Sequence, residues 1–95
     1  MASDALTGRV ATAADFEKLE PLFRANCQRM QYEWEKYAFA AKHILAHSEY
    51  GFTLMSEKAD GSAAAGFITC TFEWSDWRNG VFCWIQGLQV DTTLD

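Results

Sequence analysis

Two long apolar segments joined by a polar turn, residues 66–90, restrict the folds that this chain can adopt. The first, "FITCTFEW", alternates residue types with the period of two that is typical of a β-strand. The second, residues 81–90, is mostly apolar on both of its expected faces, which favours a central strand covered on both sides. Asn79-Gly80 between them is a strong hairpin signal. The segments therefore predict an antiparallel pair inside a larger sheet. In the first strand one expected face carries Ile68, Cys70, Phe72 and Trp74, and the other carries Phe67, Thr69, Thr71 and Glu73.

The N-terminal part of the chain predicts one edge strand followed by two helices. Residues 8–11 are short and apolar enough for the strand, and Thr12 with Asp15 fits a capping box at the start of the first helix. Pro21 lies inside this helix, so we expect a kink or a restart there. A second amphipathic pattern predicts a helix over residues 35–47, which the turn at Gly51 follows. The apolar stripe of the first helix comprises Phe16, Leu19, Phe23, Cys27 and Met30.

Residues 52–57 predict a further strand, joined to the next by a turn at Asp60-Gly61. The element order is therefore βααβββ, an α+β fold in which a mainly antiparallel sheet is backed by two helices. A length of 95 residues suits one small domain, residues 1–95.

Composition excludes several classes of function. The net charge is −5 with only eight scattered basic residues, which argues against a nucleic-acid partner. No apolar run approaches the roughly 18–20 residues of a membrane span, so we expect no membrane partner. The first ten residues lack the pattern of a signal peptide. Three cysteines without a CxxC motif predict buried free thiols, and together these features indicate a cytoplasmic protein.

Histidines and aromatic residues offer weaker signals. His43 and His47 are four residues apart on the second helix, but no third ligand has suitable spacing, so we expect no metal. Trp84, with Trp74 and Trp77, could face a ligand cation or could simply pack within the hairpin.

The element order and two sequence blocks resemble the N-terminal half of the GNAT superfamily of N-acetyltransferases. The opening "RVATAADFEKLEPLF" is similar to that family's first strand and helix, where "R-x-A-T-x-x-D" is frequent. The block "GFITCTFEWSDWRNGVFCWIQGLQV" is similar to its third and fourth strands, most closely in the polyamine and small-amine branch. The resemblance implies acetyl-CoA as the cofactor of an intact homologue and a primary amine as its acceptor.

Two departures from the family pattern bear on activity. The family holds the pyrophosphate of acetyl-CoA with an Arg/Gln-x-x-Gly-x-Gly/Ala loop after the fourth strand, whereas here Val90 is followed by "DTTLD". We therefore expect a partial domain that lacks the cofactor-binding C-terminal half, binds no cofactor by itself and is inactive alone. Gln86 and Gly87 also replace an acidic pair; Gln86 can hydrogen-bond an amine but cannot act as a base. No catalytic residue is predicted.

The resemblance assigns candidate binding residues by position. Leu88, Gln89 and Val90 match the triplet that contacts the acetyl and pantetheine portions of the cofactor. The substrate candidates are Tyr32 and Glu33 in the loop between the helices, together with Trp84 and Gln86 in the last strand.

Two other functions stay open at this stage. A non-catalytic interaction module would form a homodimer, or be completed by a partner, through an exposed last strand over residues 81–90. A small-ligand binding domain with an aromatic pocket is the third possibility.

Overall fold

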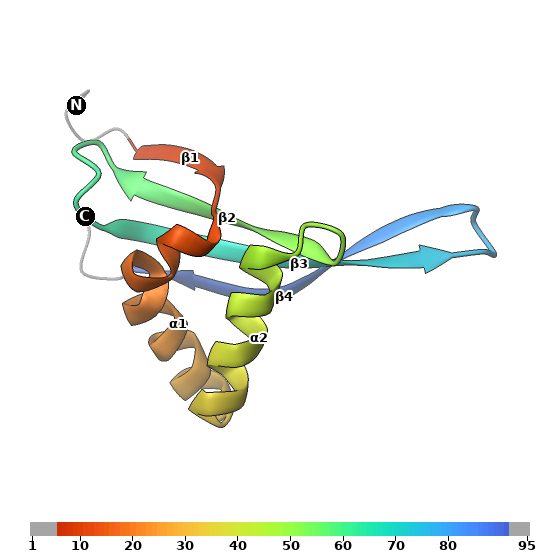
Figure 1. Cartoon of the computed structure of the whole chain (residues 1–95), viewed down its shortest axis with the longest axis horizontal. Coiled ribbons are helices and arrows are strands. Elements are labelled where there is room, and N and C mark those ends of the chain that lie inside the picture. The colour runs from red at the N-terminus through yellow and green to blue at the C-terminus, as the bar shows by residue number, and fades with distance from the viewer. Residues whose placement is uncertain (1–5, 92–95) are drawn as a thin grey trace.

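The computed structural model describes residues 6–91 and contains one sheet and two helices (Figure 1). The predictions for "MASDA" and for the last four residues lie outside this range. In chain order the elements are β1 (Leu6–Val10), a 3₁₀ turn (Ala13–Asp15), α1 (Phe16–Met30), α2 (Trp34–Ala46), β2 (Gly51–Lys58), β3 (Ala64–Ser75) and β4 (Gly80–Val90). The predicted α+β fold and its βααβββ order are confirmed. Within the described range, no helix has the length and apolar character to cross a membrane.

The four strands form an antiparallel sheet in the order β1-β2-β3-β4, and both helices cover the same face of it (Figure 1). Burial along β2 shows the two faces directly. Thr53 and Met55 are each 1% exposed on the helix side, whereas Leu54 between them is 41% exposed on the opposite side. The core lies between the helices and this sheet face, where the rings of Phe23 and Phe67 meet edge to face at 4.8 Å.

A salt-bridge network accounts for the "R-x-A-T-x-x-D" motif at the start of the chain. Arg9 on β1 donates two hydrogen bonds to Asp15, at 2.8 and 2.7 Å, and a third to Glu57 on β2 at 2.9 Å. Lys18 holds the other oxygen of Glu57 at 2.7 Å. Asp15 also accepts the backbone amide of Thr12 at 2.7 Å, as the predicted capping box requires. The motif therefore fastens β1, β2 and the start of α1 together.

Three sequence-based expectations about these elements need correction. Helix α1 continues through Pro21, so the predicted restart is wrong. Met30, placed on the core stripe, is the last residue of α1 and is 45% exposed. Of the three thiols expected to be buried, Cys27 and Cys70 are buried but Cys83 is exposed on β4.

The prediction that residues 81–90 form a central, covered strand is also wrong for the described part of the chain. Strand β4 pairs only with β3 and lies at the edge of the sheet. The distal part of the β3–β4 hairpin, around the turn between Ser75 and Gly80, extends beyond the helices as an arm (Figure 1). Apolar side chains on β4 are exposed as a result, and the largest exposed fractions belong to Ile85 (63%), Val81 (59%), Val90 (58%), Trp84 (51%) and Leu88 (51%).

Candidate functional site

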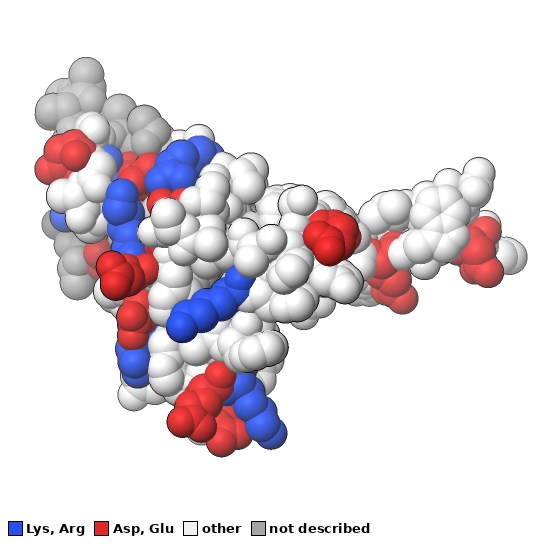
Figure 2. All heavy atoms as spheres, viewed as in Figure 1, with Lys and Arg blue, Asp and Glu red and all other residues white. Residues whose placement is uncertain are grey.

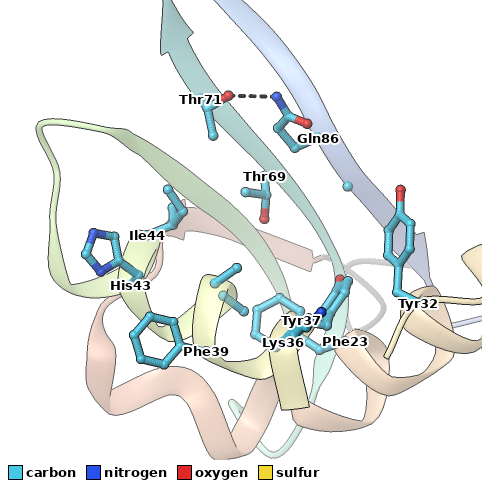
Figure 3. Close-up of a pocket in the computed structure, with 13 residues that line it drawn as sticks. Phe23, Tyr32, Lys36, Tyr37, Phe39, His43, Ile44, Thr69, Thr71 and Gln86 are labelled. Carbon is cyan, nitrogen blue, oxygen red and sulfur yellow. Dashed lines mark hydrogen bonds between the residues drawn. The ribbon is translucent and has the colours of Figure 1, made fainter. Parts of the chain in front are cut away.

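A hollow of about 660 Å³ lies between α2 and the strands β3 and β4 (Figure 3). Its walls are mostly apolar and aromatic, with a few polar groups contributed by the strands. Such a composition is typical of small-molecule sites, in which apolar walls surround a small number of orienting polar groups. The lining residues are Phe23 from α1, Tyr32 from the interhelix loop, Lys36, Tyr37, Phe39, Ala40, Ala41, His43 and Ile44 from α2, Thr69 and Thr71 from β3, and Gln86 and Gly87 from β4.

A β-bulge in β4 supplies the polar side of the hollow. Thr69 pairs with Gly87, but the next residue, Cys70, pairs with Ile85, which leaves Gln86 as the extra residue. A bulge redirects the side chains next to it and is frequent beside functional sites. Here it directs Gln86 into the hollow, where its amide donates to the hydroxyl of Thr71 at 2.9 Å (Figure 3).

Asn26 ties the helices to the bulged strand directly behind the hollow. Its side chain is 2% exposed; its amide donates to the Leu88 carbonyl at 3.1 Å, and its Oδ1 accepts from the Tyr37 hydroxyl at 2.8 Å. Burial raises the pKa of the Tyr37 phenol above its ordinary value, so Tyr37 remains a hydrogen-bond donor at neutral pH. A side chain at Gly87 would place its Cβ 3.4 Å from Asn26 Oδ1, so the glycine allows this close approach.

The charged groups at the hollow are basic. None of the described residues that line the hollow is Asp or Glu. Two of them, Lys36 and His43, are basic residue types. Lys36 is 86% exposed at its side chain and meets Glu33 at 3.6 Å, a long ion pair between two exposed groups. Acidic and basic side chains are interspersed elsewhere on the viewed face, and acidic ones lie at the arm (Figure 2). The hollow is therefore an apolar space with a basic mouth on a chain that is acidic overall.

The structure brings together two of the four predicted substrate residues. Tyr32 and Gln86 both line the hollow. Glu33 precedes α2 and pairs with Lys36 outside the lining. Trp84 lies further out on β4, where its indole donates to Glu73 at 2.6 Å, so it packs within the hairpin and contributes no wall. Trp74 and Trp77 are 59% and 86% exposed on the arm, away from the hollow.

The three predicted cofactor residues lie together at the end of β4, beside α1. The Leu88 carbonyl accepts hydrogen bonds from Asn26 and from Arg29 Nη2, the latter at 2.8 Å. Gln89 Oε1 accepts from Arg29 Nε at 3.3 Å, and Val90 pairs with Gly66 on β3. This segment adjoins the hollow through Gly87, so the two candidate sites are continuous along one strand.

Sequence reasoning missed Asn26, Thr69, Thr71 and the aromatic residues of α2 that line the hollow. One signal for Asn26 was available, because it follows Phe23 by three residues and so falls on the apolar stripe of α1, where a polar residue needs a partner. His43 and His47 stack on each other at 4.2 Å, and His43 lies 5.2 Å from the ring of Tyr50. Among residues 6–91 no group of three His, Cys, Asp or Glu side chains is arranged to hold a metal ion.

The comparisons with known proteins identify the fold. No family model and no curated protein matches the sequence. A solved structure described as a possible acetyltransferase from Clostridium difficile 630 is similar, with a TM-score of 0.77 and 25% identity over 95% of this chain and 60% of its own. A ribosomal-protein-alanine N-acetyltransferase from Brucella melitensis biovar Abortus has a TM-score of 0.72 and 17% identity over 94% of this chain and 58% of its own. A GNAT family acetyltransferase from Staphylococcus aureus has a TM-score of 0.68 and 20% identity over 94% of this chain and 64% of its own.

These likenesses show that the chain has the fold of GNAT acetyltransferases. The chain spans only about 60% of the length of the structures that it matches.

Proposed function

We propose that these residues are the acceptor-binding part of a GNAT-related N-acetyltransferase, which transfers an acetyl group from acetyl-CoA to a primary amine. One observation carries the proposal. The bulge of β4 directs Gln86 into an apolar hollow, in a chain with the acetyltransferase fold. Because the matched structures are longer, the proposal assigns turnover to a longer protein, of which residues 1–95 form a partial domain that lacks the cofactor-binding half.

Gln86 is proposed to receive the acceptor amine. Its amide nitrogen is engaged by Thr71, and its Oε1 accepts no hydrogen bond from any residue in the described range. A neutral amide oxygen accepts an N–H without stabilising the ammonium form as a carboxylate would. The apolar walls also disfavour the charged amine, so the hollow favours the uncharged, nucleophilic form. Tyr32 also lines the hollow, whereas Glu33 and Trp84 lie outside its lining.

Leu88, Gln89 and Val90 are proposed to meet the acetyl and pantetheine part of acetyl-CoA. Support comes from their position next to Gly87, where the hollow meets the open edge of β4. Strand edges offer backbone groups that can hydrogen-bond an extended ligand. Placing the thioester beside the acceptor amine would supply the proximity on which such a transfer depends.

Calorimetric titration of acetyl-CoA into this chain tests the assignment of a partial domain. We expect weak binding and no release of CoA, because the amides that would hold the pyrophosphate belong to the absent loop. Micromolar affinity for acetyl-CoA would contradict the partial-domain proposal.

A non-catalytic interaction module is the second candidate, favoured by the sheet face opposite the helices. Val10, Leu54, Ile68 and Leu88 are register partners across all four strands, and three of them are at least 41% exposed. Apolar surface of this extent beside an open strand edge favours pairing with a second copy or a partner. Light scattering at high micromolar concentration tests it, and a clean monomer would count against this candidate.

A further inference from the structure

The charges around the hollow bear on the kind of amine that it can accept. The sequence resemblance pointed to the polyamine and small-amine branch, and a polyamine carries more than one ammonium group. An ammonium group moved out of water needs a carboxylate or a comparable partner to offset its desolvation. The described lining residues include no Asp or Glu, and the two charged or chargeable side chains that protrude into it from α2 are Lys36 and His43.

Lys36 is the group available to a ligand. Its side chain is 86% exposed, and its partner Glu33 is 62% exposed at a distance of 3.6 Å. An exposed helix pair of this kind is worth only about 0.3–0.5 kcal/mol, so a ligand carboxylate can replace Glu33 at little cost. His43 is less available, because its ring stacks on His47 at 4.2 Å and lies 6.3 Å from the ring of Phe39.

The walls favour an apolar or aromatic body for the ligand. Phe23, Tyr37 and Phe39 present rings from the two helices, and Figure 3 shows them on the side of the hollow opposite Gln86. The volume, about 660 Å³, is within the range of about 300–1,000 Å³ for small-molecule sites and exceeds the needs of a short aliphatic amine. Lys36 at the mouth and Gln86 on the strand side are therefore separated by an apolar space.

We infer that the acceptor is a monoamine with an apolar, preferably aromatic, body and a carboxylate, and that polyamines are excluded. The carboxylate pairs with Lys36 at the mouth, the body lies against the rings of α1 and α2, and the amine faces Gln86. 4-(Aminomethyl)benzoate, which carries its amine and its carboxylate at opposite ends of one ring, is the simplest compound with these three groups in this order. This inference rests on the proposed function in one respect, that the ligand is the acceptor of the acetyl group. The binding preference itself can be measured without any acetyl transfer.

Titrations of the whole chain, followed by ¹H–¹⁵N NMR in the absence of acetyl-CoA, test the preference. The probes are 4-(aminomethyl)benzoate, 4-(aminomethyl)benzamide, which has the same body without the carboxylate, and spermidine. We expect 4-(aminomethyl)benzoate to shift the amides of Thr71, Gln86 and Gly87 and to bind about two- to fivefold tighter than the benzamide, as one exposed ion pair allows. Spermidine is expected to leave these amides unshifted.

Two variants separate the role of Lys36 from general charge. In Lys36→Met the preference for 4-(aminomethyl)benzoate over the benzamide should disappear while 4-(aminomethyl)benzamide still binds. The control is Lys42→Met on the same helix, because Lys42 lies over the ring of Phe16 at 4.8 Å and does not line the hollow; it should keep the full preference.

Spermidine binding at these amides as tightly as 4-(aminomethyl)benzoate, or a preference unchanged in Lys36→Met, would overturn the inference. So would the absence of any shift with 4-(aminomethyl)benzoate up to its solubility limit. A protein that contains these residues and acetylates amines, yet shows no carboxylate preference, would refute this inference alone. A confirmed preference in a longer protein that contains these residues and binds acetyl-CoA, yet transfers no acetyl group to any amine, would refute the proposed function alone.

Discussion

Replacing Asn26 by alanine tests whether the buried link between the helices and the bulged strand holds the candidate site together. Asn26 is 2% exposed and makes two side-chain hydrogen bonds, one with the Tyr37 hydroxyl and one with the Leu88 carbonyl. Each is worth about 1 kcal/mol net, and a buried group left unpaired costs about 1–3 kcal/mol more. Arg29 still holds the Leu88 carbonyl at 2.8 Å in the variant, so only the Tyr37 hydroxyl is orphaned. These values sum to a loss of about 3–5 kcal/mol in the free energy of unfolding.

Urea unfolding followed by circular dichroism measures this loss, and two further variants define its source. Tyr37→Phe removes one of the two hydrogen bonds and leaves the buried Asn26 Oδ1 without this donor, so it should cost about 2–4 kcal/mol. Gln28→Ala, at an exposed position of the same helix, should stay within about 0.5 kcal/mol of the parent protein. The effects of Asn26→Ala and Tyr37→Phe should be non-additive, because they share a bond. An Asn26→Ala variant as stable as Gln28→Ala would refute the reasoning.

Three other predictions concern the salt bridge between Arg9 and Asp15, the pairing of β2 with β3, and the exposed strand β4. The Arg9 guanidinium holds the pKa of Asp15 below its unfolded value of about 3.9, so the stability that this ion pair contributes is complete above pH 3.9 and is lost as the pH falls below that value. Asp15→Asn should therefore flatten the acid limb of a stability–pH curve measured by thermal unfolding, and an unchanged limb would exclude this role. Gly51→Ala would place a Cβ against the Cys70 carbonyl and should abolish cooperative unfolding. The control Gly8→Ala, whose nearest new contact is 3.8 Å away, should still unfold cooperatively. Equal melting curves for the two variants would contradict the close pairing of β2 with β3. Ile85→Lys, at a residue 63% exposed, should keep stability within about 0.5 kcal/mol and lower any self-association seen by light scattering, and undiminished association would place the interface elsewhere.

The sequence was sufficient to predict the elements because each has a local cause. Alternation in "FITCTFEW" predicted a strand that the structure extends to Ala64–Ser75, and Thr12 with Asp15 marked the start of the helical region. A turn just before Gly80 was also predicted, and the observed turn covers residues 76–79 and ends at Asn79, whose φ is positive at 54°. These features depend on neighbouring residues in the chain, so one sequence reveals them.

The site was only partly predictable, because it depends on register between distant residues. The bulge exists because Thr69 pairs with Gly87 while Cys70 pairs with Ile85, and alternation within a single strand cannot reveal such a shift. It places Gln86 in the hollow and leaves the earlier candidate Trp84 outside the lining. The apolar character of β4 predicted coverage on both faces, yet burial also depends on which segments pack against the strand, and in the described range none covers its outer edge.

A chimera provides the most direct test that the hollow beside the β4 bulge receives the amine acceptor of an acetyltransferase. Residues 1–90 would be joined to the C-terminal portion of the matched Clostridium difficile structure, and CoA release from acetyl-CoA would be measured with 4-(aminomethyl)benzoate and other primary amines. The account predicts amine-dependent CoA release that falls in the Gln86→Leu chimera, which keeps the side-chain size but loses the hydrogen bonds. A chimera that folds and binds acetyl-CoA but releases no CoA with any primary amine would contradict it.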